Sequence, residues 1–139
     1  MSEVDVLLVE DNPDDAELTL RALRKSNVAE RLLHVDDGAK AIEFLFGGAK
    51  PPRFILLDLK LPKIDGLEVL RRVKADARTR TIPVVVLTSS KEERDVMASY
   101  DLGVNSYIVK PVGFEQYMRT ISEVGRYWND LNQLPQTAL

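Results

Sequence analysis

The chain has 139 residues, of which 45% are hydrophobic and 29% are charged, and it contains no cysteine. This length fits one compact domain, which buries roughly 70% of its unfolded surface and is stable without disulfides. The balance of 19 basic and 22 acidic residues gives a net charge of −3, which argues against a nonspecific nucleic-acid binder. The acidic N-terminus and apolar runs of only about four residues argue against a signal peptide and a membrane span. We therefore expect a cytoplasmic, single-domain protein with no nucleic-acid or membrane partner.

Five short apolar runs alternate with segments that carry helix signals. Unbroken apolar runs are typical of strands that are covered on both faces. The runs are Val6–Val9, Leu32–Val35, Phe54–Leu57, Ile82–Leu87 and Tyr107–Val109. This strand–helix alternation, repeated five times, predicts an α/β fold with a doubly wound parallel sheet and helices on both faces.

Helix boundaries have their own signals. Asn12 followed by Pro13 is typical of an N-cap with proline in the first turn. Asp65 with Glu68, and Ser90 with Glu93, have capping-box spacing. Gly47 and Gly103 lie where helices are expected to end. In the last helical segment, residues 113–131, apolar side chains recur every three or four positions. We expect one domain over residues 1–131 and a C-terminal tail over 132–139.

Polar residues follow four of the apolar runs at the edge of the sheet where ligands bind in such folds. They are Glu10, Asp11, Asp58, Thr88 and Lys110. Clustered carboxylates repel one another unless a cation lies among them, and oxygen ligands without histidine or cysteine favour Mg²⁺. A nearby ammonium and hydroxyl suit phosphoryl transfer, for which the carboxylate of Asp58 is the best nucleophile.

Four segments at these positions resemble the receiver domain of two-component response regulators. The resemblance extends from about Val4 to Leu131, and its motifs are Val9–Asn12, Leu57–Pro62 with Asp65-Gly66, Leu87–Ser90 and Tyr107–Pro111. It implies a flavodoxin-like strand order of 2-1-3-4-5 with five helices. It also implies a response regulator that catalyses its own phosphorylation and dephosphorylation, and that is not an enzyme acting on an external substrate.

The resemblance assigns a role to each site residue. Asp58 is the expected phosphoacceptor, which receives its phosphoryl group from a sensor histidine kinase. Asp11, Asp58 and the backbone carbonyl of Lys60 are the expected Mg²⁺ ligands, with Glu10 acting through a bound water. Lys110 is expected to pair with the phosphoryl group.

The resemblance also implies a switch. Thr88 moves its hydroxyl toward the phosphoryl group, and Tyr107 turns inward after it. The surface formed by the helix after Ser90, the run Tyr107–Val109 and the final helix then controls a downstream protein. In this family the bond between Lys110 and Pro111 is cis.

Within the family, the chain is similar to regulators paired with phytochrome-type histidine kinases. The features that carry this likeness include Asn12–Asp15, Ile82–Thr88 and Tyr127-Trp128. The likeness implies a homodimer that forms through the fifth strand and the fifth helix.

Three other classes remain as alternatives. A flavodoxin-like electron carrier binds a phosphate at its first turn, which Glu10 and Asp11 would repel. A haloacid-dehalogenase-type phosphatase expects a second carboxylate two residues after its nucleophile, where this chain has Lys60. A constitutive binding module would have lost the acceptor, the acidic pair or the lysine. His34, the only histidine, is expected to be structural and to lie away from the site.

Overall fold

The computed structural model describes residues 3–27 and 31–135. It contains a five-stranded parallel sheet with the order β2-β1-β3-β4-β5, which confirms the predicted fold class. The strands are β1 (Val6–Val9), β2 (Leu32–Val35), β3 (Phe54–Leu57), β4 (Val84–Thr88) and β5 (Ser106–Val109). Each therefore begins and ends within about two residues of the predicted run.

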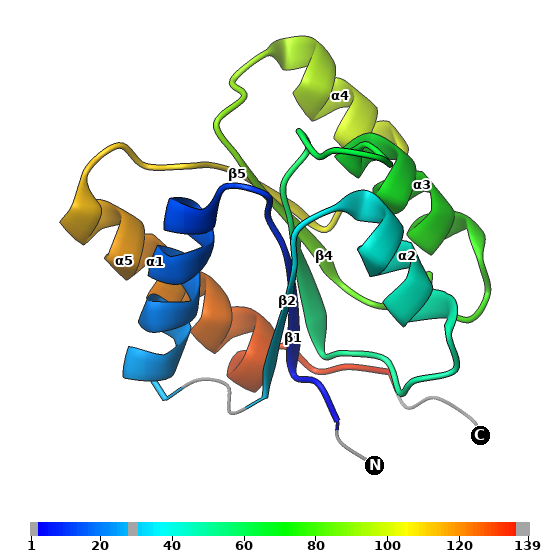
Figure 1. The fold of residues 1–139 in the computed structure, drawn as a ribbon, viewed down its shortest axis with the longest axis horizontal. Coiled ribbons are helices and arrows are strands. Elements are labelled where there is room, and N and C mark those ends of the chain that lie inside the picture. Colours follow the sequence, from blue (N-terminus) through cyan, green and yellow to red (C-terminus); the bar gives the residue numbers. More distant parts are fainter. Residues whose placement is uncertain (1–2, 28–30, 136–139) are drawn as a thin grey trace.

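Helices cover both faces of the sheet. They are α1 (Pro13–Lys25), α2 (Gly38–Phe46), α3 (Gly66–Ala75), α4 (Glu93–Asp101) and α5 (Phe114–Gly125), followed by a π-helical segment η1 (Arg126–Leu131). Helices α1 and α5 lie together on one face, and α2 and α3 lie on the other (Figure 1). None of the helices in the described part of the chain is long and apolar enough to cross a membrane.

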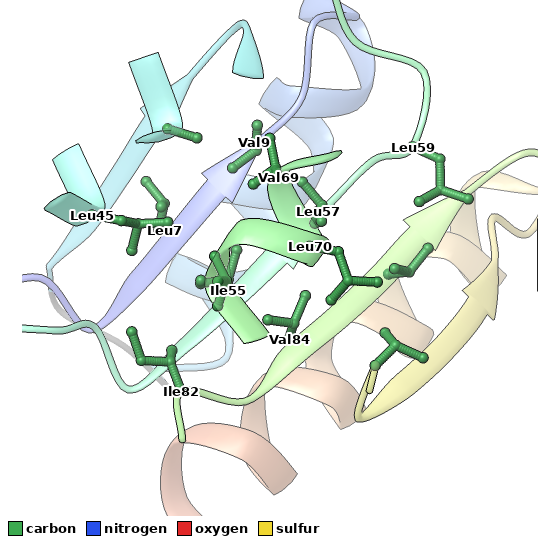
Figure 2. Close-up of a cluster of buried hydrophobic side chains, with 14 residues drawn as sticks. Leu7, Val9, Leu45, Ile55, Leu57, Leu59, Val69, Leu70, Ile82 and Val84 are labelled. Atoms are coloured by element: carbon green, nitrogen blue, oxygen red, sulfur yellow. The ribbon is translucent and has the colours of Figure 1, made fainter. Parts of the chain in front are cut away.

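Alternating strand residues divide the core into two layers. In β1, Val6 and Leu8 pack in the cluster under α1 and α5, whereas Leu7 and Val9 pack in the cluster under α2 and α3. Figure 2 shows this second cluster, in which Ile55 and Leu57 of β3 lie beside β1 residues. Successive strand side chains point to opposite faces, so a sheet buried on both faces needs the unbroken apolar runs seen in the sequence.

The helix signals were confirmed only in part. The Asn12 side chain accepts hydrogen bonds from the backbone N–H groups of Asp14 and Asp15, as expected of an N-cap. The prediction for Ser90 is wrong, because α4 begins at Glu93 with Glu92 at its N-cap. Ser90 instead donates its hydroxyl to Asp95 at 2.5 Å, so it bridges the loop to the first turn of the helix.

A second expected capping box is also absent. Asp65 stands at the N-cap of α3, but its side chain forms no capping hydrogen bond. Glu68 accepts hydrogen bonds from Arg71 and Arg72 further along the same helix. The two arginines hold the carboxylate, which therefore does not reach back to the start of the helix.

Gly66 brings the start of α3 against the end of β3. A Cβ at this position would collide with the backbone oxygen of Asp58 and approach the Cα of Leu59 to 2.5 Å. Its own N–H donates to the oxygen of Leu59 at 2.9 Å, which holds the two segments together.

We expect Gly66→Ala to lower the free energy of unfolding by about 1–3 kcal/mol, because backbone atoms must move to admit the methyl group. Urea denaturation measures the change. Gly113→Ala is the control, since nothing lies within 4 Å of a Cβ there; its cost should stay below about 1 kcal/mol. Equal losses in the two variants would contradict the close approach at Gly66.

Candidate functional site

The predicted site residues meet at the carboxyl edge of the sheet. Glu10 and Asp11 follow β1, Asp58 follows β3, and Lys110 follows β5, while Thr88 is the last residue of β4. Backbone hydrogen bonds extend the strand pairing into this rim: the N–H of Asp58 donates to Val9 at 3.0 Å, and the N–H of Lys110 donates to Thr88 at 2.7 Å. The rim is therefore held by the sheet rather than by mobile loops.

Three carboxylates form one oxygen-rich group. Glu10, Asp11 and Asp58 each offer an oxygen, and these atoms all lie within 4.8 Å of one another. Glu10 and Asp58 are buried, whereas Asp11 is exposed. Hard oxygen ligands at this spacing, open to solvent on one side, fit a divalent cation such as Mg²⁺ that keeps part of its hydration shell.

The ammonium of Lys110 is surrounded by carboxylates. Its Nζ lies 2.7 Å from Glu10 Oε1, 2.8 Å from Asp15 Oδ2 and 3.0 Å from Asp58 Oδ2. The Lys110 side chain is 10% exposed, and those of Glu10 and Asp58 are 2% and 8% exposed. Buried charges at such distances are stable only when they are paired, so these groups fix one another in position.

Burial and pairing move two pKa values in the same direction for different reasons. Burial raises the pKa of Glu10 to about 7, although the hydrogen bond from Lys110 acts against the increase. Burial alone would lower the pKa of Lys110, but its hydrogen bonds to Asp15 and Glu10 outweigh burial and raise it. Lys110 is therefore a fixed positive charge at neutral pH, while Glu10 titrates there.

The expected switch residues lie beside this group. Thr88 is fully buried, and its Oγ1 accepts a long hydrogen bond of 3.4 Å from the Ser90 N–H. Tyr107 on β5 is half-buried and donates its hydroxyl to the backbone oxygen of Ser90 at 3.0 Å. Both side chains thus contact the loop between β4 and α4.

Two expectations have different outcomes. The bond between Lys110 and Pro111 is trans, so the expected cis bond is wrong for this structure; trans is the ordinary preference of such bonds. The Lys60 N–H donates to Asp58 Oδ1 at 3.3 Å. The role of the Lys60 carbonyl as a metal ligand stays a prediction.

Two residues at the site were missed. Asp15 was named only within the motif Asn12–Asp15, yet its Oδ2 lies 2.8 Å from Lys110 Nζ. His34 was expected away from the site, but its Nε2 lies 2.7 Å from the backbone oxygen of Glu10. His34 is thus a neighbour of the acidic group, because its strand β2 pairs with β1, which Glu10 follows.

The fold and the site together define a flavodoxin-like α/β protein with an acidic cluster and a buried lysine at the carboxyl edge of its sheet. Residues 6–122 match the response regulator receiver domain, and the chain belongs to this family. Phosphorylation on aspartate and Mg²⁺ binding are typical of the family, which acts in two-component signal transduction.

One relative with a similar sequence, and two with both a similar sequence and a similar fold, support this membership. The chain is 44% identical to the probable methanogenesis regulatory protein FilR2 of Methanothrix harundinacea, over 96% of this chain and 88% of that protein. It is 39% identical to the phosphorylated cyanobacterial phytochrome response regulator RcpA, with a TM-score of 0.90 over 97% of this chain and all of that one. The Mn²⁺-bound form of Rcp1, a response regulator from Synechocystis, is 38% identical, with a TM-score of 0.89 over the same shares.

The raised pKa of Glu10 predicts that protons and a divalent cation compete for the site near neutral pH. We expect Mg²⁺ to bind roughly tenfold more weakly at about pH 6 than at about pH 8, because a carboxyl with a pKa of about 7 is mostly protonated at the lower pH. Calorimetric titration measures the ratio. Glu10→Gln removes the titrating carboxyl, so its Mg²⁺ affinities at the two pH values should be nearly equal. A difference as large as that of the parent protein would contradict the prediction.

Proposed function

We propose that this chain is a phosphorylation switch whose acceptor is Asp58. The observation that carries the proposal is the position of this carboxylate: it directly follows the central strand β3, lies within the acidic group, and has Lys110 Nζ 3.0 Å from its Oδ2. A nucleophile, a fixed positive charge and a set of cation ligands are the parts that phosphoryl transfer needs.

The donor we propose is a phosphohistidine on a sensor histidine kinase. A carboxylate oxygen of Asp58 attacks phosphorus, an O–P bond forms, and the P–N bond to the histidine breaks. The electron pair of that bond stays on the histidine nitrogen, which takes up a proton. Lys110 offsets negative charge on the phosphoryl oxygens, in a partly buried setting where such a contact is strong.

Glu10, Asp11, Asp58 and the backbone carbonyl of Lys60 are the groups that we propose to hold Mg²⁺. When bound, the cation supplies positive charge that offsets the charge on the transferred phosphoryl group. Glu10 and Asp11 contribute the carboxylates that hold it near Asp58, and we propose that Glu10 acts through a bound water. The Mn²⁺-bound relative and the spacing of the three carboxylates support this assignment.

Thr88 and Tyr107 are the proposed switch residues. Their shared contact with the β4–α4 loop at Ser90 supports this role, because a movement of the Thr88 hydroxyl changes the loop to which Tyr107 is hydrogen-bonded. The output is then a population shift in the surface formed by α4, β5 and α5 that a downstream protein reads. The same site would catalyse both phosphorylation and dephosphorylation of Asp58, with no external substrate turned over.

We also propose that the receiver domain extends to Leu131, beyond the residues that the family match covers. Trp128 packs against the core cluster under α1 and α5, and Arg53 Nε donates to the backbone oxygen of Asn129 at 3.0 Å. These contacts support η1 as part of the domain, followed by the tail 132–139.

The cytoplasmic location stays a prediction.

A phytochrome-type histidine kinase is the partner that we propose. The likeness to RcpA, a phytochrome response regulator, supports it.

We expect Asp58→Asn to abolish phosphorylation, because an amide cannot serve as the nucleophile. Intact mass after incubation with acetyl phosphate, with and without Mg²⁺, measures one added phosphoryl group. Asp65→Asn is the matched control, since Asp65 is exposed and lies outside the acidic group; it should be phosphorylated like the parent protein. Equal phosphorylation of Asp58→Asn would refute the assignment, and no adduct on the parent protein would favour the constitutive binding module.

We also propose a homodimer through β5 and α5. Strand β5 pairs with β4 alone at this end of the described sheet, and Phe114 at the start of α5 is 56% exposed. Sedimentation velocity at high protein concentration, with and without acetyl phosphate and Mg²⁺, should detect a dimer in at least one state. A monomer in both states would exclude this interface.

A further inference from the structure

The imidazole ring of His34 is hydrogen-bonded to the backbone beneath the acidic group. Its Nε2 lies 2.7 Å from the oxygen of Glu10. A backbone oxygen can only accept a hydrogen bond, so Nε2 carries a proton and donates it. His34 is paired in register with Leu8, and its ring therefore reaches past Val9 to the residue that directly follows β1.

In the described part of the sheet, the strand ladder stops short of this oxygen. Strand β2 ends at Val35, whose own oxygen accepts from the Glu10 N–H at 3.1 Å, and Asp37 already stands at the N-cap of α2. The residue Glu10 is 1% exposed, so its oxygen is also shielded from water. The His34 ring supplies the hydrogen bond that such a buried backbone oxygen needs.

This hydrogen bond orients the peptide group that leads into Asp11. The Glu10 oxygen and the Asp11 N–H belong to one planar unit, so a bond to the oxygen sets the orientation of the whole unit. The next peptide unit is held as well, because the Asn12 N–H donates to Glu10 Oε2 at 3.1 Å. Asp11 lies between these two units, and its side chain is exposed. His34 and Glu10 thus set the direction in which the Asp11 side chain leaves the backbone.

We propose that His34 is a positioning residue of the cation site, which acts by holding the peptide unit between Glu10 and Asp11. The inference rests on the proposed role of these two carboxylates in holding Mg²⁺. Loss of the ring would leave the buried Glu10 oxygen without a donor, and rotation of the peptide unit toward water would relieve this cost. That rotation would carry the Asp11 carboxylate out of the group of three, whose oxygens lie within 4.8 Å of one another.

Calorimetric titration with Mg²⁺ tests this role at about pH 8, where the Glu10 carboxyl, with a pKa of about 7, is mostly ionised. We expect His34→Leu to bind Mg²⁺ roughly tenfold more weakly than the parent protein, as is typical when a group that orients metal ligands is removed. His34→Gln should recover most of the affinity, because its amide nitrogen is as many bonds from Cα as Nε2 is and can donate. Parent affinity in His34→Leu, or no recovery in His34→Gln, would overturn the proposal.

Leu33→Val is the matched control. Leu33 precedes His34 on β2 and packs against the cluster under α2 and α3, so it points to the opposite face of the sheet. This variant weakens the packing of the same strand but leaves the hydrogen bond to Glu10 in place, and it should bind Mg²⁺ like the parent protein. A loss of affinity as large as that of His34→Leu would show general support of β2 and overturn the specific role of the ring.

A second measurement does not depend on the cation. Without Mg²⁺, the NMR amide resonance of Asp11 should shift in His34→Leu and change much less in Leu33→Val, because this N–H belongs to the peptide unit that the ring holds. An unshifted resonance in His34→Leu would overturn the inference. Asp11→Asn tests the proposed cation site itself: if it binds Mg²⁺ as tightly as the parent protein, or if the parent does not bind Mg²⁺, that site is refuted and the role of His34 falls with it.

Discussion

The pairing of one buried ammonium with three carboxylates is the interaction on which the rest of the site depends. Lys110 contacts one residue that follows β1, one in α1 and one that follows β3, so it fixes the relative positions of the groups around Asp58. The single positive charge of Lys110 does not balance the carboxylates of its three partners and of Asp11. The excess negative charge favours a divalent cation at this site, since closely spaced carboxylates repel one another without one.

The sheet makes this pairing possible. In the order β2-β1-β3-β4-β5 all strands run in the same direction, so their carboxyl ends meet at one edge. Two backbone hydrogen bonds extend the strand pairing to the site residues themselves: the N–H of Asp58 donates to Val9, and the N–H of Lys110 donates to Thr88. Apolar layers on both faces of the sheet hold this edge rigid, and the polar residues at it therefore need little reorganisation to act.

The sequence was sufficient for the strands, the fold class and the convergence of the acidic residues with Lys110, because each of these follows from local patterns and from the geometry of parallel sheets. It was not sufficient for contacts that depend on how far side chains reach. Asp15 looks like any acid in a first helical turn until Lys110, 95 positions away, is placed beside it. Ser90 has capping-box spacing, but the loop conformation directs its hydroxyl to Asp95. His34 reaches Glu10 only because the two strands are paired.

Exposure sets the direction from which the site can be reached. Glu10, Asp58 and Lys110 are almost completely covered, whereas Asp11 is exposed and Asp15 is partly so. Asp11 and Asp15 therefore lie where the site meets solvent. Two negative charges there oppose an anionic donor, and a cation beside Asp11 reduces one of them. A contact between Lys110 and Asp15 on that side both neutralises the second charge and leaves the lysine close to the position at which the phosphoryl group arrives.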